Sequence, residues 1–82
     1  MNIKKSKKFE NAYVIKGMEI ITEHSEAIYQ DFTRHYFIKD SEEKNGEVIV
    51  PYVFFSRHYQ KWYEDVAYVS KTIFNSIISR LN

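Results

Sequence analysis

The sequence predicts a small α+β domain, and three observations support this fold class. A β-prone stretch surrounds an Asn-Gly pair in a hairpin expected around residues 36–54. Apolar residues recur at steps of three and four over about 18–36, and again over about 57–81. Together these predict a small antiparallel sheet of two to three strands, one helix in the N-terminal half and one long amphipathic helix at the C-terminal end.

The chain of 82 residues fits one domain. Residues 1–8 contain four lysines and no apolar periodicity, so they are expected to form a flexible basic arm before a folded domain at 9–82. Hydrophobic residues make up 44% of the chain, which argues against intrinsic disorder. The arm lacks the apolar stretch of a signal peptide, and no apolar run is long enough to cross a bilayer, so a cytoplasmic protein without membrane contact is expected.

The first part of the predicted domain combines a short strand with a helix. Residues 9–16 include aromatic and β-branched side chains and stop before Gly17, which is typical of a strand. The spacing over 18–36 predicts the helix. Its start leaves an alternative open, in which 18–22 form a second strand paired with 11–16 through a turn at Gly17.

The predicted hairpin comes next. Its first arm is the apolar segment 36–39, and its polar loop at 40–46 ends in Asn45-Gly46, a pair that tolerates positive φ. The second arm, 47–55, contains Pro51, which cannot donate a ladder hydrogen bond. Proline therefore predicts an edge, a bulge or the end of the strand at this point.

The predicted C-terminal helix starts after Ser56, a favourable N-cap, and contains no Gly or Pro over 57–81. Its apolar residues cover an arc of about 180° on a helical projection, wider than a surface helix needs. A helix of this length would measure about 39 Å, longer than a body of this size. An overhanging apolar face predicts a homodimer. The expected interface consists of Trp62, Val66, Val69, Ser70, Ile73, Phe74, Ile77, Ile78 and Leu81.

Four further residues near the strand-to-helix junction are expected to contact a protein partner. They are Tyr68, Tyr52, His58 and Lys61. Tyrosine is enriched at the energetic centres of interfaces, and Tyr68 lies outside the predicted apolar arc. The partner itself has no signature in the sequence.

Catalytic and metal-binding chemistry has little support. The chain has no cysteine, which excludes disulfides and thiol chemistry. His24, Asp31 and His35 would line one stripe of the first helix, but the first two would lie about 10 Å apart. His58 has no partner arrangement typical of a hydrolase beyond nearby carboxylates. We therefore expect no enzyme activity, no cofactor and no metal.

Charge is unevenly distributed along the chain. Residues 1–8 carry +4, residues 9–50 carry −5 and residues 51–82 carry +2, which sum to the net charge of +1. Lys4, Lys5, Lys7 and Lys8 form the basic arm, whose ammonium groups would neutralise phosphates in a nucleic acid.

These features favour a small non-enzymatic regulatory or inhibitory protein that binds a macromolecule, as a homodimer through the C-terminal helix. The size and the Lys-, Ile-, Asn- and Tyr-rich composition suit a phage or another mobile element. The alternative is a nucleic-acid-binding regulator that uses the lysine arm.

Overall fold

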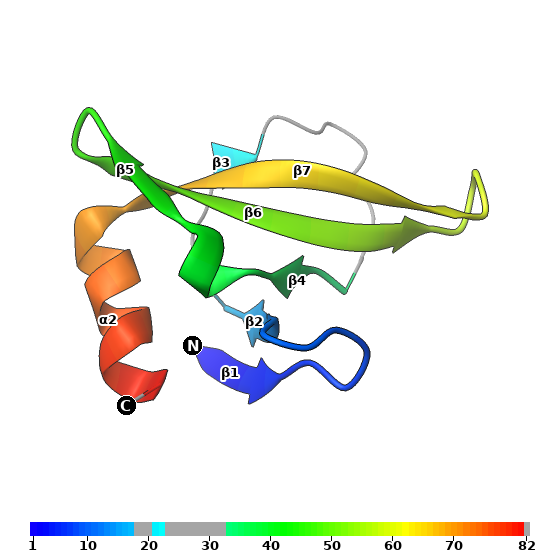
Figure 1. Ribbon diagram of the computed structural model, residues 1–82, viewed down its shortest axis with the longest axis horizontal. Helices are drawn as coiled ribbons and strands as arrows, with labels where there is room; N and C mark the ends of the chain where they lie inside the picture. Colours follow the sequence, from blue (N-terminus) through cyan, green and yellow to red (C-terminus); the bar gives the residue numbers. More distant parts are fainter. Residues whose placement is uncertain (18–20, 23–32, 82) are drawn as a thin grey trace.

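The computed structural model shows an antiparallel sheet that runs through the molecule, with a helix at one end (Figure 1). The structure describes residues 1–17, 21–22 and 33–81. The strands are β1 (Asn2–Lys5), β2 (Tyr13–Lys16), β3 (Ile21–Thr22), β4 (His35–Tyr36), β5 (Glu42–Lys44), β6 (Glu47–Ser56) and β7 (Lys61–Ser70). A 3₁₀ turn η1 (Ile38–Asp40) precedes β5, and helix α2 (Lys71–Leu81) comes directly after β7.

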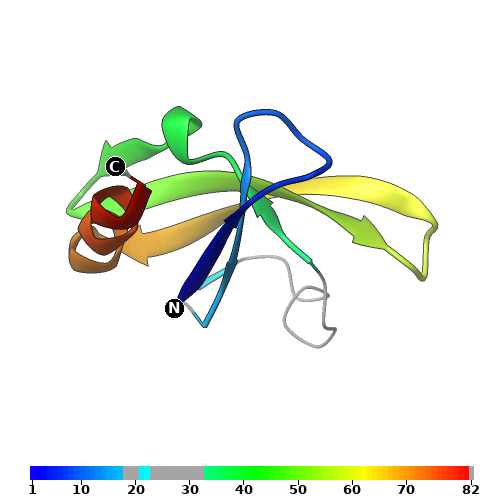
Figure 2. The same ribbon diagram turned by 90° about the horizontal axis from the view of Figure 1, so that it is seen from below.

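The sheet is built around the β6–β7 hairpin. Ten residue pairs join these strands, from Glu47 opposite Ser70 to Ser56 opposite Lys61. The strand order is β1-β2-β4-β6-β7-β3, and β5 pairs with β6 outside this path. The sheet is strongly twisted, so β1 crosses the long hairpin at a steep angle when the molecule is viewed from below (Figure 2).

The predicted sheet of two to three strands is therefore wrong, because the described residues contain seven strands in one sheet. Lys4 and Lys5 of the expected basic arm lie in β1, which pairs with β2 along its whole length. The predicted helix over about 18–36 is contradicted at both ends by β3 and β4. Residues 23–32 between them lie outside the described residues, as do 18–20. The alternative strand at 18–22 matches β3 in type, but β3 pairs with β7 instead of β2.

The long C-terminal helix over 57–81 is also wrong, since its first half forms a turn and strand β7. Residues 61–70 are rich in aromatic and β-branched side chains, which pack well on a pleated surface. Val48–Phe54 supplies a buried strand for this segment to pair with, and that pairing outweighs helical propensity. About half of the residues in the wide apolar arc belong to strand β7. When the apolar residues of a strand are plotted on a helical projection, they are spread over many directions, which makes the arc look wide.

Two serines mark where the backbone changes direction. The Ser56 Oγ accepts a hydrogen bond from the Tyr59 N–H at 3.2 Å, which is the bond expected of an N-cap, but it stabilises a turn. Gln60 ends this turn with a φ of 55°. Because the positive φ is adopted by a residue other than glycine, the sequence gives no indication of a turn here. The Ser70 Oγ accepts from the Ile73 N–H at 3.2 Å and caps α2.

The Asn45-Gly46 turn is confirmed. The two residues have φ values of 53° and 81°, and they join β5 to β6 with Lys44 opposite Glu47. The first arm of the hairpin is β5 instead of residues 36–39. Pro51 lies inside β6, at the gap between the residues paired with β5 and those paired with β4.

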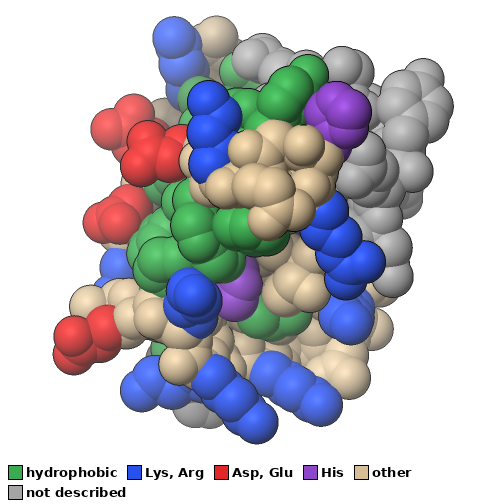
Figure 3. All heavy atoms as spheres, turned by 90° about the vertical axis from the view of Figure 1, so that its right-hand side faces the viewer, with side chains coloured by type: hydrophobic (Ala, Val, Ile, Leu, Met, Phe, Trp, Pro, Cys, Tyr) green, Lys and Arg blue, Asp and Glu red, His purple; other side chains and the backbone are tan. Residues whose placement is uncertain are grey.

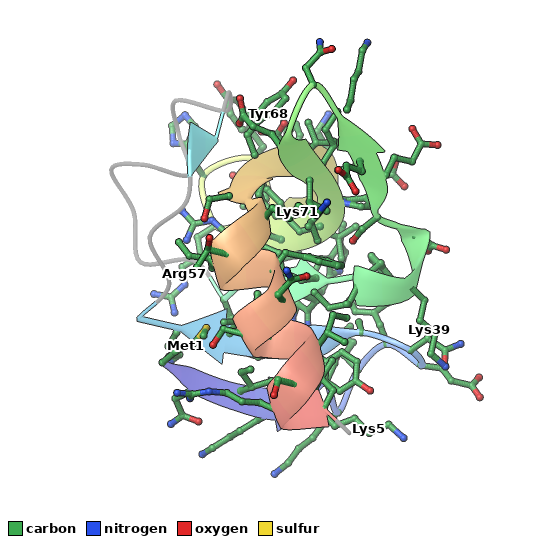
Figure 4. All side chains as sticks on the ribbon, turned by 90° about the vertical axis from the view of Figure 1, so that its left-hand side faces the viewer. Met1, Lys5, Lys39, Arg57, Tyr68 and Lys71 are labelled. Carbon is green, nitrogen blue, oxygen red and sulfur yellow. The ribbon has the colours of Figure 1, made fainter. Side chains whose placement is uncertain are left out.

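One face of the sheet carries the core. Its buried residues on the two long strands are Val48, Val50, Tyr52, Phe54, Ala67 and Val69. Ile77 of α2 is fully buried against this cluster, and neighbouring apolar residues of the helix are partly buried there. Figure 4 shows α2 lying across the ends of β1 and β2, where the Arg80 Nη1 donates to the Met1 carbonyl at 2.7 Å.

Candidate nucleic-acid interface

The opposite face of the sheet is more exposed, and we call it the open face. Residues directly opposite each other on paired strands project to the same side of a sheet. The pairings therefore place Lys4, Val14, His35, Val53 and Glu64 in one row across β1, β2, β4, β6 and β7. The row begins with a cation at the β1 edge and ends with a carboxylate on β7.

A basic hollow of about 380 Å³ lies at the β1 end of the open face. It is lined by Asn2, Lys4, Lys5, Lys7, Lys8, Val14, Lys16, Thr33 and His35, a set with no acidic side chain. Within residues 1–17, 21–22 and 33–81, the structure contains one ion pair, between Lys71 and Glu43. None of the five lysines of the basic hollow is therefore neutralised by a described carboxylate.

The lysines come together because two segments are held in place. Pairing of β1 with β2 sets Lys16 opposite Asn2, so Lys4 and Lys16 are diagonal neighbours on one face. The loop after β1 is fixed by Ser6, whose Oγ accepts the backbone N–H groups of Lys8 at 3.2 Å and Phe9 at 3.0 Å. The loop closes with a hydrogen bond from the Ser6 N–H to the Ala12 carbonyl.

His35 anchors this loop from the sheet. The Ser6 Oγ lies 2.8 Å from the His35 Nδ1. Because the Ser6 oxygen already accepts two N–H groups, its own hydrogen is directed to Nδ1, which makes the ring neutral with its proton on Nε2. Burial and, to a smaller extent, the charge of Lys8 lower the pKa of His35, which favours the same neutral form.

An aromatic cluster adjoins the basic hollow. The Phe9 ring packs edge-on against the rings of His35 at 5.2 Å and Trp62 at 5.1 Å. Phe55 contacts Trp62 from β6 at 5.5 Å. The Lys8 Nζ lies 5.1 Å from the centre of the Trp62 ring, within the range of a cation–π interaction.

This cluster borders a second hollow of about 680 Å³. The lining residues are Lys8, Phe9, Val53, Lys61, Trp62, Tyr63 and Glu64. Figure 3 looks onto this end of the sheet and shows apolar side chains with basic ones below them and acidic ones to one side. Lys8 lines both hollows, so the two are neighbours on this side of the molecule.

A third hollow of about 450 Å³ lies further along β6 and β7 and is acidic. Asp40, Glu64 and Asp65 are among its lining residues. The Tyr52 hydroxyl donates to an Asp65 carboxylate oxygen at 3.5 Å. Of these carboxylates, Glu64 projects from the open face, whereas Asp65 pairs with Tyr52 on the core face. The open face therefore has lysines at its β1 end and a carboxylate on β7, and an anionic ligand is attracted to the lysines.

The four lysines expected to bind nucleic acid all line the basic hollow, although Lys5 pairs with Tyr13 and projects from the core face. The other expected sites are not brought together. Tyr52 is fully buried and Tyr68 is partly buried in β7, while His58 and Lys61 are exposed near the β6–β7 turn. These four residues share no single surface. Binding of a protein through them stays a prediction.

The nine residues expected in a dimer interface are also separated. Val69 and Ile77 are fully buried within the chain's own core. Trp62 and Val66 project from the open face, because they pair with Phe55 and Pro51. Self-association stays a prediction, but the long overhanging helix that suggested it is absent from residues 57–70.

Metal binding and catalysis gain no geometric support. Two of the three residues in the expected metal stripe, His24 and Asp31, lie outside the described residues, and His35 is bonded to Ser6. Across the described ranges, no three His, Asp or Glu side chains are placed to hold a metal ion. The His58 ring packs against Tyr59 at 4.6 Å in the exposed turn.

No described helix is long and apolar enough to span a bilayer.

Sequence reasoning missed Lys16, Phe9 and Trp62 as parts of this surface. Lys16 reaches the basic hollow only through strand pairing, and Phe9 reaches Trp62 across 53 positions of sequence. No local pattern encodes either contact. The Ser-x-Lys-Phe order at residues 6–9 was a usable signal, since serine commonly accepts N–H groups two and three residues ahead.

No protein-family model matches the chain. Comparison with curated proteins and with solved structures also gives no match. The function is therefore argued from the surface itself.

Proposed function

We propose that this chain is a non-enzymatic nucleic-acid-binding protein whose basic hollow holds backbone phosphates. The observation that supports this proposal is that five lysines line one hollow whose described lining residues include no acidic side chain. Of the two functions that the sequence suggests, this is the one for which a built surface exists in the described residues.

The lysines suit phosphates because they are close in space and lack described carboxylate partners. A cation that neutralises a phosphate releases a condensed counterion, which provides most of the sequence-independent affinity. The net charge of the whole chain is only +1, so attraction depends on this local arrangement. The acidic hollow on β6 and β7 limits the anionic ligand to the β1 end.

The first test compares charge removal at the hollow with charge removal elsewhere. Lys4→Gln with Lys16→Gln deletes two charges from the hollow, and Lys39→Gln with Lys44→Gln deletes two exposed charges from η1 and β5. Binding of a labelled oligonucleotide of about 16 nucleotides is measured by fluorescence anisotropy at about 50 and 200 mM salt.

Wild-type affinity should fall steeply with salt, and the hollow variant should lower the slope of log K against log salt by about 1 for each phosphate that is no longer neutralised. The matched control should keep the wild-type slope. A salt-independent affinity, or equal losses in both double variants, would contradict a phosphate site at the basic hollow.

A further inference from the structure

We propose that the ligand is a single strand whose unpaired bases stack on an aromatic platform formed by Phe55 and Trp62. This inference rests on the proposed function, because it uses the basic hollow to hold the phosphates of the same strand. It adds the substrate class, which the lysines alone do not determine.

The platform lies at the turn end of the β6–β7 hairpin. Phe55 and Trp62 are cross-strand partners on the open face, and their ring centres are 5.5 Å apart. Tyr59 lies outside this platform, because its ring is 5.9 Å from that of Tyr63, which pairs with Phe54 on the core face. Residues on a hairpin keep fixed positions, so the platform is preorganised for a planar ligand.

These aromatic rings are exposed although a core lies on the other face of the same strands. Trp62 and Phe55 are 38% and 36% exposed. A gathering of exposed aromatic side chains at one place marks a binding site more often than scattered ones do. Aromatic faces bind bases of any sequence, because every base has a π-face.

Lys8 and His35 connect the platform to the basic hollow. Lys8 lines both hollows and covers the Trp62 ring at 5.1 Å, and the His35 ring lies 5.8 Å from Trp62 while also lining the basic hollow. A backbone held on the lysines therefore presents its bases towards Trp62. Duplex DNA cannot do this, because its bases are already stacked on each other inside the helix.

Glu64 gives the second hollow a polarity that fits bases better than phosphates. Its side chain lines the hollow beside Trp62 and is exposed. A carboxylate repels phosphate but accepts hydrogen bonds from the exocyclic amino group of cytosine. The volume of about 680 Å³ is within the range of small-ligand sites and admits a nucleobase.

The test compares three ligands with about equal numbers of phosphates. They are a single strand, the same strand without bases, and a duplex with the same total number of nucleotides. Trp62 is the only tryptophan in the chain, so its fluorescence reports stacking directly. The intact single strand should bind about tenfold or more tighter than the abasic strand. It should quench the fluorescence, whereas the abasic strand should leave it unchanged.

Two variants locate the effect. Trp62→Leu should lower single-strand affinity towards that of the abasic strand and leave abasic binding unaltered. Phe55→Leu removes the second ring of the platform and should give a smaller loss in the same direction, so the answer does not depend on one variant folding correctly. Tyr59→Leu, whose ring lies beside Tyr63, should leave single-strand affinity unaltered.

Equal affinity for all three ligands with unchanged fluorescence would overturn base stacking while leaving phosphate binding at the lysines intact. Failure to bind any of the three would overturn both proposals. Preference for the duplex would also overturn the platform, since its rings would then have no base to contact.

Discussion

The two faces of the sheet differ although the same strands build both. On the core face, Tyr36, Tyr52 and Phe54 are at most 2% exposed. On the open face, Phe55 and Trp62 remain exposed, with the Lys8 Nζ 5.1 Å from the centre of the Trp62 ring. Because side chains alternate along a strand, neighbours such as Phe54 and Phe55 contribute to different properties. Substitutions at two neighbouring positions should therefore affect stability and ligand contact separately.

The largest expected difference between the faces comes from this neighbouring pair. Phe54→Ala removes a fully buried ring from the core and should lower the free energy of unfolding by about 3–5 kcal/mol. Phe55→Ala removes a partly exposed ring and should cost about 1 kcal/mol or less. Urea unfolding of the two variants measures both values. Similar losses would show that the open face is covered as fully as the core face.

High pH provides a second test of the core face. Burial raises the pKa of Tyr36 to about 12, an effect that the charge of Arg34 opposes. Between pH 10 and 12 the unfolded chain has released this proton while the folded chain retains it. Stability should then fall with rising pH by about 1.4 kcal/mol per pH unit.

Tyr36→Phe has no proton to release at this position. The difference between wild-type and variant unfolding free energies should therefore change between pH 10 and 12 and stay constant below pH 9 or so. Parallel curves across the whole range would show that Tyr36 titrates alike in both states. The other ionisable groups are common to both proteins, so their contributions cancel in the comparison.

The smallest expected effect concerns the loop after β1, which carries Lys7 and Lys8. Ser6→Ala removes the acceptor of two N–H groups and the hydroxyl bonded to His35, which should cost about 1–2 kcal/mol. It should also weaken oligonucleotide binding, because Lys7 and Lys8 lose their anchored loop. Ser79→Ala, on the exposed side of α2, should change neither property. Equal behaviour of the two variants in urea unfolding and anisotropy would contradict an anchoring role for Ser6.

Local chemistry in the sequence predicted the short-range features well. Asn45-Gly46 specified a tight turn, because both residues adopt positive φ, and Tyr13–Lys16 ended as a strand before Gly17. Ser56 was identified as a capping residue, and its hydroxyl makes the expected bond. The same bond is compatible with a helix or a turn, so the cap did not determine the structure of the residues after it.

Long-range pairing was not predictable from one sequence. Residues 61–70 fit a helical projection and a strand, and only their ten-pair register with β6 selects the strand. The lysines of residues 1–8 were recognised, but Lys16 and the aromatic platform join them through contacts between distant segments. The candidate site is therefore a product of topology, whereas its phosphate-binding chemistry is already visible in residues 4–8.

The hydrogen bond from Arg80 to the Met1 carbonyl joins positions 79 residues apart. Edge strand β1 is thus held by β2 on one side and by the last turn of α2 at its start. Hydrogen exchange should detect this coupling, because a ligand that holds β1 in place also protects the last turns of α2.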